Sequence, residues 1–171
     1  MIFNGIKRRW LRKEIKKLQN LQDRPLIKWP ESLVVIFNGE QTVDFEPFYK
    51  WAKELGIKKE SVVLVAYVRD KNKSTVQGAH LVDRKLIKWS GGITDDEIKE
   101  LIKRPFDLQV NYYDTQNDLL DFISLALPSR LKVAYGVLSD ESLFDLSIDV
   151  PLNDYSAFFK ELQKYLKILT Q

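Results

Sequence analysis

Leu33-Val34-Val35-Ile36-Phe37 is an unbroken apolar run of strand length, and it decides the fold class of this chain. A strand that is apolar on both sides must be covered on both faces of its sheet, as in the parallel sheets of α/β proteins. Apolar residues at helical spacing follow in residues 44–56, and residues 62–68 form a second apolar strand. Strand, helix and strand with short links predict a βαβ unit whose two strands are parallel.

The rest of the chain continues this alternation of strands and helices. Residues 81–89 fit an edge strand or an irregular extended segment, and a short helix follows. Residues 108–113 are a third strand, followed by an almost wholly apolar helix that begins near Asn117. Residues 130–138 and 142–150 predict two strands in an antiparallel hairpin, because only three residues join them. The last predicted element is an amphipathic helix.

These elements predict a three-layer α/β sandwich that is Rossmann-like, with a mostly parallel sheet and one antiparallel strand at or near its edge. A chain of 171 residues with 44% hydrophobic composition has the length for one domain with a full core. We therefore assign residues 33–171 to a single α/β domain, residues 25–32 to a linker, and residues 1–24 to a basic amphipathic helical arm.

Charge is distributed unevenly along the chain. The first thirty residues hold nine Lys or Arg against two acids, whereas residues 31–171 hold 18 bases and 22 acids. At about 100° per residue, apolar side chains gather on one half of the predicted arm helix and most cations on the other. A basic arm that leads a mildly acidic body indicates an anionic partner for the arm.

Three interpretations of the arm stay open. Its apolar side can dock on the domain, or its cations can bind the phosphates of a nucleic acid such as RNA, including the ribosome. Alternatively, the helix can lie on an anionic membrane surface with Phe3, Ile6 and Trp10 inserted. The candidate residues for binding the anionic partner are Lys7, Arg8, Arg9, Trp10, Arg12, Lys13, Lys16 and Lys17.

Several classes of protein are excluded by what the sequence lacks. No run approaches the roughly 18 apolar residues of a membrane-spanning helix, and the arm has no secretory signal. We therefore expect a cytoplasmic protein, peripheral at the inner membrane if the arm binds lipid. The chain has no Cys and a single His, His80, which excludes disulfides and the usual zinc sites. We predict no metal and no cofactor.

A possible ligand pocket lies where the strands end, because open α/β sheets bind ligands beyond the carboxyl ends of their strands. The candidate pocket residues are Asn38, Asp70, Asn111, Tyr113 and Asp114. Gln109 and Asn111 point to the same side of their strand, and buried amides there need hydrogen-bond partners. A ligand, the backbone or bound water could supply these partners.

No catalytic residue can be assigned from the sequence. The chain has no nucleophile elbow, kinase signature or metal-binding cluster. Gly91-Gly92 precedes a predicted helix, but no phosphate-binding pattern surrounds the pair, and the acids that follow it would repel an anion. Whether the protein is an enzyme is therefore left open.

Several short segments carry a resemblance to a known family. They are Val110-Asn111-Tyr112-Tyr113-Asp114, Lys132-Val133, Leu143-Phe144-Asp145-Leu146, Phe159-Lys160-Glu161-Leu162 and Lys164-Tyr165-Leu166. Together with the basic arm, they make the chain resemble an uncharacterised family of short cytoplasmic proteins from Bacteroidetes, the domain of unknown function 6913. The resemblance implies a bacterial, intracellular origin, and it brings no activity and no catalytic residues.

The sequence as a whole predicts a non-catalytic interaction module whose basic helix docks on an anionic partner. The alternative is a small-molecule-binding protein or a transferase that uses the strand-end loops. A third hypothesis is a homo-oligomer in which the arm packs on a neighbouring copy.

Overall fold

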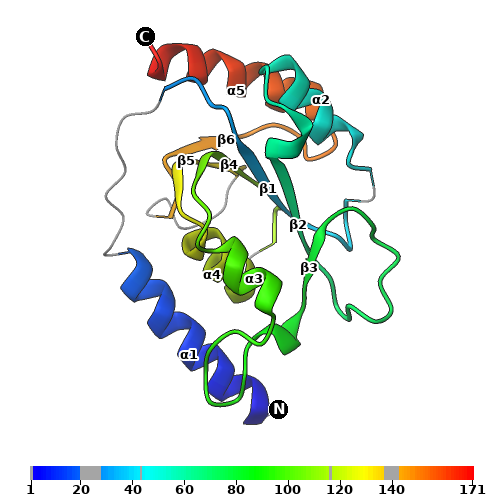
Figure 1. The fold of residues 1–171 in the computed structure, drawn as a ribbon, viewed down its shortest axis with the longest axis vertical. Coiled ribbons are helices and arrows are strands. Elements are labelled where there is room, and N and C mark those ends of the chain that lie inside the picture. Colours follow the sequence, from blue (N-terminus) through cyan, green and yellow to red (C-terminus); the bar gives the residue numbers. More distant parts are fainter. Residues whose placement is uncertain (1, 20–27, 43, 116, 137–142) are drawn as a thin grey trace.

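Figure 1 shows the computed structural model of the chain, in which one six-stranded sheet lies between two layers of helices. The structure describes residues 2–19, 28–42, 44–115, 117–136 and 143–171. The strands are β1 (Leu33–Asn38), β2 (Val62–Tyr67), β3 (His80–Val82), β4 (Phe106–Tyr112), β5 (Ser129–Tyr135) and β6 (Leu146–Ile148). The helices are α1 (Ile2–Gln19), α2 (Glu46–Glu54), α3 (Asp96–Leu101), α4 (Asp118–Ala126) and α5 (Tyr155–Leu169), with short 3-10 turns η1 (Lys59–Ser61) and η2 (Arg84–Leu86).

The apolar run that decides the fold class forms β1, a central strand of the sheet. All six residues of β1 are buried, and β1 pairs in parallel with β2 on one side and β4 on the other. Because α2 connects β1 to β2, the predicted βαβ unit is confirmed. The strand order is β3-β2-β1-β4-β5-β6, so β3 is the short edge strand that the sequence allowed.

One part of the predicted topology is wrong. β5 and β6 pair in parallel, through Val133↔Leu146 and Tyr135↔Ile148, and do not form an antiparallel hairpin. β6 begins only at Leu146, so ten residues separate it from β5. A connection of that length can carry the chain back along the sheet, which a three-residue turn cannot. The sheet is therefore all parallel, and the predicted turn at residues 139–141 lies outside the described residues.

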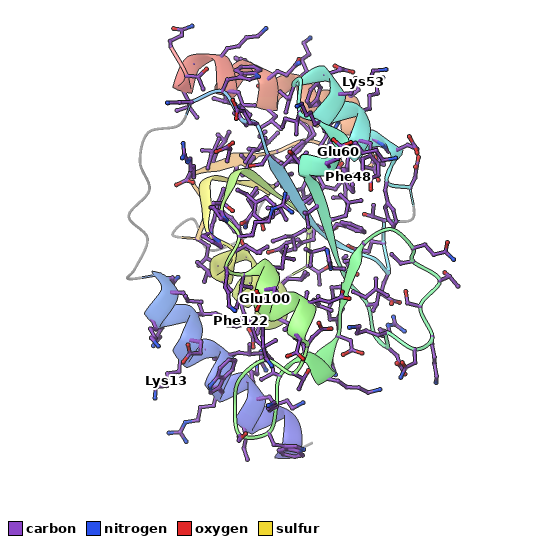
Figure 2. All side chains as sticks on the ribbon, in the orientation of Figure 1. Lys13, Phe48, Lys53, Glu60, Glu100 and Phe122 are labelled. Carbon is purple, nitrogen blue, oxygen red and sulfur yellow. The ribbon has the colours of Figure 1, made fainter. Side chains whose placement is uncertain are left out.

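Two hydrophobic layers cover the two faces of the sheet, because successive side chains of a strand point to opposite faces. Val34 of β1 faces the layer formed by α1, α3 and α4, whereas Val35 faces the layer formed by α2 and α5. The second layer is rich in aromatic rings, and Phe48 points into it from α2 (Figure 2). The predicted three-layer α/β arrangement is thus confirmed.

The basic arm forms α1, an 18-residue helix that lies along the outside of the body next to α4. Most of the predicted linker that follows it lies outside the described residues. Among the helices that the structure describes, none has the length and apolar character to cross a membrane.

Candidate functional site

α1 packs its apolar side on the layer that contains α4. Leu11 is buried, and the centre of the Trp10 ring lies 5.5 Å from that of Phe122. Ile15 and Leu18 pack against the same layer. The apolar stripe of the arm therefore holds α1 on the domain, and Trp10 is half-buried in that contact.

One residue that the sequence placed on the apolar half of the arm, Ile6, differs from this pattern. Ile6 has 52% of its surface exposed, so it lies away from the contact with the domain. The side chain of Phe3 lies outside the described residues. The docked side of α1 is thus narrower than the half-circumference predicted from the apolar residues.

Three of the candidate cations bind the body at the edge of the docked side. The Arg8 Nε atom lies 2.8 Å from Asp118 Oδ2, and the Arg12 Nε atom lies 3.8 Å from the same oxygen. Lys7 Nζ donates to the carbonyl oxygen of Arg84 at 3.1 Å. Asp118 is the first residue of α4, where the helix dipole also favours a carboxylate. Because the ion pairs are largely exposed, they orient α1 more than they stabilise it.

A second group of cations points away from the body, and we call Arg9, Lys13 and Lys16 the basic face. All three side chains are exposed, and none forms an ion pair with a residue that the structure describes. Figure 2 shows Lys13 directed away from the domain. Their spacing of four and three residues places them on one stripe that is about 10 Å long, given a rise of 1.5 Å per residue. Lys17 lies beside this stripe, 4.0 Å from Glu14.

A glycine turn fixes the position of Trp10. Gly91 has a positive φ of +88°, and a Cβ atom built on it would lie only 2.4 Å from Trp10 Nε1. Any larger residue at this position would therefore push against the indole. The sequence presents Gly91-Gly92 only as a candidate phosphate loop and indicates no role for the neighbouring Trp89. No local signal connects this turn with the arm, because about 80 residues separate them.

We predict that Gly91→Ala lowers the free energy of unfolding by about 3 kcal/mol, through left-handed strain plus a clash with Trp10. Gly92→Ala is the matched control, since Gly92 has a φ of +90° and a Cβ there would have no neighbour within 4 Å. We expect the control to lose only about 1 kcal/mol, from the strain alone. Urea unfolding followed by circular dichroism measures both variants, and equal losses would contradict the close contact between Gly91 and Trp10.

The predicted pocket residues Asn38 and Asp114 lie at the carboxyl ends of the neighbouring strands β1 and β4. Gln41 Nε2, in the turn after β1, donates to Asp114 Oδ1 at 3.0 Å and so links the two strand ends. The side chain of Asn38 accepts a hydrogen bond from the Glu40 backbone N–H at 3.0 Å, which shapes the same turn. Both predicted residues thus have partners within the protein.

Asp70 lies in the loop after β2 and takes part in a different set of contacts. Its Oδ1 atom accepts a hydrogen bond from the Asn72 backbone N–H at 3.0 Å and lies 3.6 Å from Lys85 Nζ. The Asn72 hydrogen bond lowers the pKa of Asp70, and the Lys85 charge adds to this effect against the opposing desolvation. No interaction joins Asp70 to Asn38 or Asp114 in the described part of the chain.

The other two predicted pocket residues, Asn111 and Tyr113, are completely buried on the α4 side of the sheet. Asn111 Nδ2 donates to the Val133 carbonyl oxygen at 3.1 Å, and Asn111 Oδ1 accepts from Gln109 Nε2 at 3.1 Å. Burial raises the pKa of Tyr113 well above its ordinary value, and the nearby Asp121 carboxylate adds to the shift. These groups therefore form part of the folded interior. Their role in ligand binding stays a prediction.

Two open cavities lie elsewhere on the molecule. A recess of about 550 Å³ lies between α1, η2 and the start of α4. Four cationic side chains and two carboxylates line it: Lys7, Arg8, Arg12, Arg84, Asp118 and Asp121. A groove of about 700 Å³ lies between α2 and α5, where Trp51 and Phe159 line it. None of the five predicted pocket residues lines either cavity.

The single histidine lies beside an acidic side chain. His80 Nδ1 is 3.5 Å from Glu97 Oε2, an exposed carboxylate on α3. Asp83, three residues after His80, accepts hydrogen bonds from the backbone N–H groups of Lys71 and Lys85. Within the described ranges, no group of three His, Cys, Asp or Glu side chains could hold a metal ion.

The fold and the site define a class of protein: an α/β domain with an all-parallel six-stranded sheet and a basic helix docked on one face. The chain belongs to the family of unknown function DUF6913, whose family model matches residues 7–169. The match extends from the cations of α1 to the end of α5, so the arm belongs to the family pattern, and the predicted membership of this family is confirmed. No curated protein and no solved structure matches the chain.

Proposed function

We propose that this protein is a non-catalytic interaction module that docks on an array of phosphate groups through the basic face of α1. Such an array is the chemistry that a nucleic-acid backbone and an anionic membrane surface share. The observation that carries the proposal is the orientation of α1. Its residues Trp10, Leu11, Ile15 and Leu18 pack on the domain, while the basic face projects outward without ion-pair partners in the described structure.

The charge balance of α1 supports this proposal. The helix holds seven Lys or Arg residues and one acid, Glu14. Like charges at such spacing repel one another, so they destabilise the isolated helix rather than hold it together. A field of one sign on a fixed surface attracts anions and accelerates their encounter with it. The basic face therefore has a physical use in binding that it lacks in folding.

The direct test replaces Arg9, Lys13 and Lys16 by alanine together and measures binding to structured RNA and to anionic vesicles. The chain offers a matched control on α5, where Lys160, Lys164 and Lys167 are exposed and have the same spacing of four and three residues. Both triple variants lose the same charge and keep good helix formers. The α5 variant also loses the exposed ion pair of Lys164 with Glu161, at 3.5 Å, which contributes little to stability.

We expect the α1 triple variant to bind its partner about tenfold to a hundredfold more weakly, since each cation near an anionic surface contributes about 1 kcal/mol before screening. If the partner is a nucleic acid, the slope of log affinity against log salt should also fall by nearly one for each cation that no longer neutralises a phosphate. The α5 variant should bind like the unmodified protein. If both triple variants bind equally weakly, the protein is attracted to anions through its overall charge, and the proposal is wrong.

The family resemblance leads us to place this function in the bacterial cytoplasm, peripheral at the inner membrane if the partner is lipid. A homo-oligomer in which α1 contacts a neighbouring copy is tested by light scattering of the two triple variants. If the particle mass changes in the α1 variant alone, the basic face mediates self-association and does not bind an anionic partner.

A second candidate function, small-molecule binding or group transfer, is favoured by the strand order. The order β3-β2-β1-β4-β5-β6 changes direction between β1 and β4. In doubly wound, Rossmann-like sheets ligands bind at this position, and here Asn38 and Asp114 flank it. Thermal unfolding with a panel of nucleotides tests this candidate. A rise in midpoint with one nucleotide supports it, and an unchanged midpoint throughout the panel counts against it.

A further inference from the structure

We propose that the phosphate array belongs to an anionic lipid bilayer, and that Ile6 and Trp89 insert into its interfacial layer beside the basic face. This inference rests on the proposed function, because the bilayer is offered as the partner of the same basic face. To the predicted Ile6 it adds Trp89, from a distant part of the chain, and it leaves Trp10 packed on the domain. It also selects a class of partner that the charges alone do not select.

The first observation is the exposure of the two side chains. Ile6 is 52% exposed and Trp89 is 48% exposed, and both belong to the few large apolar residues at the surface of the described structure. Single exposed apolar residues need no explanation, but neighbouring ones indicate an interaction surface.

The second observation is that both residues lie close along the chain to the contact between Trp10 and Gly91. Ile6 precedes Trp10 by one turn of α1, and Trp89 lies two residues before Gly91, on which the Trp10 indole packs. Figure 1 shows the loop that follows η2 lying against the N-terminal half of α1. The contact between Trp10 and Gly91 thus brings one exposed apolar residue from the helix and one from the turn to the same end of the molecule.

The third observation is that the turn is held in place. The Lys88 backbone N–H donates to the Gly92 carbonyl oxygen at 2.9 Å, and the Gly91 N–H donates to the Lys88 carbonyl oxygen at 3.1 Å. Ile87 and Ile93 form an antiparallel bridge at its base. Trp89 therefore lies on a fixed turn. Binding through Trp89 does not need to order this turn, so it loses little conformational entropy there.

The chemistry of the pair favours a bilayer over a nucleic acid. A tryptophan ring can stack on a base, but an exposed isoleucine offers neither a π face nor a hydrogen bond to a nucleic acid. At a membrane surface, tryptophan suits the headgroup level and isoleucine suits the start of the acyl region. Lys and Arg nearby then meet anionic headgroups. Since Trp10 and Leu11 stay packed on the domain, α1 does not need to undock.

The experiment uses the full chain and measures flotation with phosphatidylcholine vesicles that contain or lack phosphatidylglycerol, with structured RNA as a parallel arm. The test variant is Ile6→Ala combined with Trp89→Ala, and the matched control is Ile168→Ala, which removes a 56%-exposed isoleucine from α5. Trp89→Phe keeps an aromatic ring at the turn and should retain most of the binding. Thermal unfolding confirms that each variant folds.

We expect binding only to the anionic vesicles, a blue shift of tryptophan emission on binding that Trp89→Phe removes, and about tenfold weaker binding by the double variant. The Ile168→Ala control should bind normally. If the protein binds RNA and not vesicles, the proposed function stands and the bilayer is overturned. If it binds vesicles equally with and without Ile6 and Trp89, the insertion is overturned. If it binds neither partner, the proposed function fails as well.

Discussion

Trp51→Ala is expected to lower the free energy of unfolding by about 4 kcal/mol, the largest effect of a single substitution that we predict. Trp51 is 3% exposed, at the centre of the aromatic layer between the sheet and α5. Its ring stacks on Phe158 and Phe159 at centroid distances of 5.3 and 6.0 Å and meets Tyr112 edge-on at 5.5 Å. Truncation removes these ring contacts together and leaves a cavity that three neighbouring rings cannot fill by small shifts.

Two other tryptophan variants calibrate this expectation. Trp51→Phe replaces the two-ring indole by a single aromatic ring and keeps part of the stacking. We therefore expect it to lower the free energy of unfolding by about 2 kcal/mol. Trp29→Ala changes a residue that is 39% exposed and whose Nε1 donates to the Leu55 carbonyl oxygen at 2.9 Å, so it should lose about 1 kcal/mol. Urea unfolding gives all three values. A loss below about 2 kcal/mol for Trp51→Ala would mean that Trp51, which lines the groove between α2 and α5, is loosely packed.

The sequence predicts the central strands because their signal is local. Each residue from Leu33 to Phe37 is apolar, and a continuous apolar run needs cover on both faces whatever its neighbours are. The pairing of β5 with β6 depends instead on the length of the connection between them. The apolar residues Val137, Leu138, Leu143 and Phe144 indicate strand where the connection lies, which leaves only three residues for a turn. The apolar alternation from residue 142 onward fits a strand in either orientation, so only the tertiary arrangement decides that it pairs in parallel.

In the candidate site, too, features with a local sequence signal are predicted, and features that depend on tertiary contacts are not. The seven basic residues of the predicted interface are visible in the sequence, and the outward direction of Arg9, Lys13 and Lys16 follows from helical spacing once Leu11 is known to be buried. The turn that carries Trp89 cannot be assigned to this surface from sequence, since the contact that places it joins Trp10 to Gly91 across the fold. Sequence reasoning also leaves open which partner satisfies a buried amide such as Asn111.

We predict that Gln109→Met lowers the free energy of unfolding by about 3 kcal/mol although it preserves most of the side-chain volume. Gln109 is completely buried, and its Nε2 donates to the Ser124 hydroxyl at 2.8 Å and to the Ser124 carbonyl oxygen at 2.9 Å. Its Oε1 accepts from Ser129 Oγ at 2.7 Å. The methionine supplies no polar atom that replaces these bonds, so several buried groups lose a partner, and each such loss costs about 1 kcal/mol or more.

A double variant measures how much of this loss comes from the hydrogen bond between Gln109 and Ser129. Ser129→Ala alone should cost about 1 kcal/mol, because it leaves Gln109 Oε1 without its donor. In the Gln109→Met background, Ser129→Ala should cost nearly nothing, because the Ser129 hydroxyl has already lost its amide acceptor. Urea unfolding of the single and double variants measures this coupling. If the two costs simply add, the serine and the amide are independent in the folded protein. In that case the hydrogen bond between Ser129 and Gln109 contributes no net stability, and the cost of Gln109→Met comes from the bonds to Ser124.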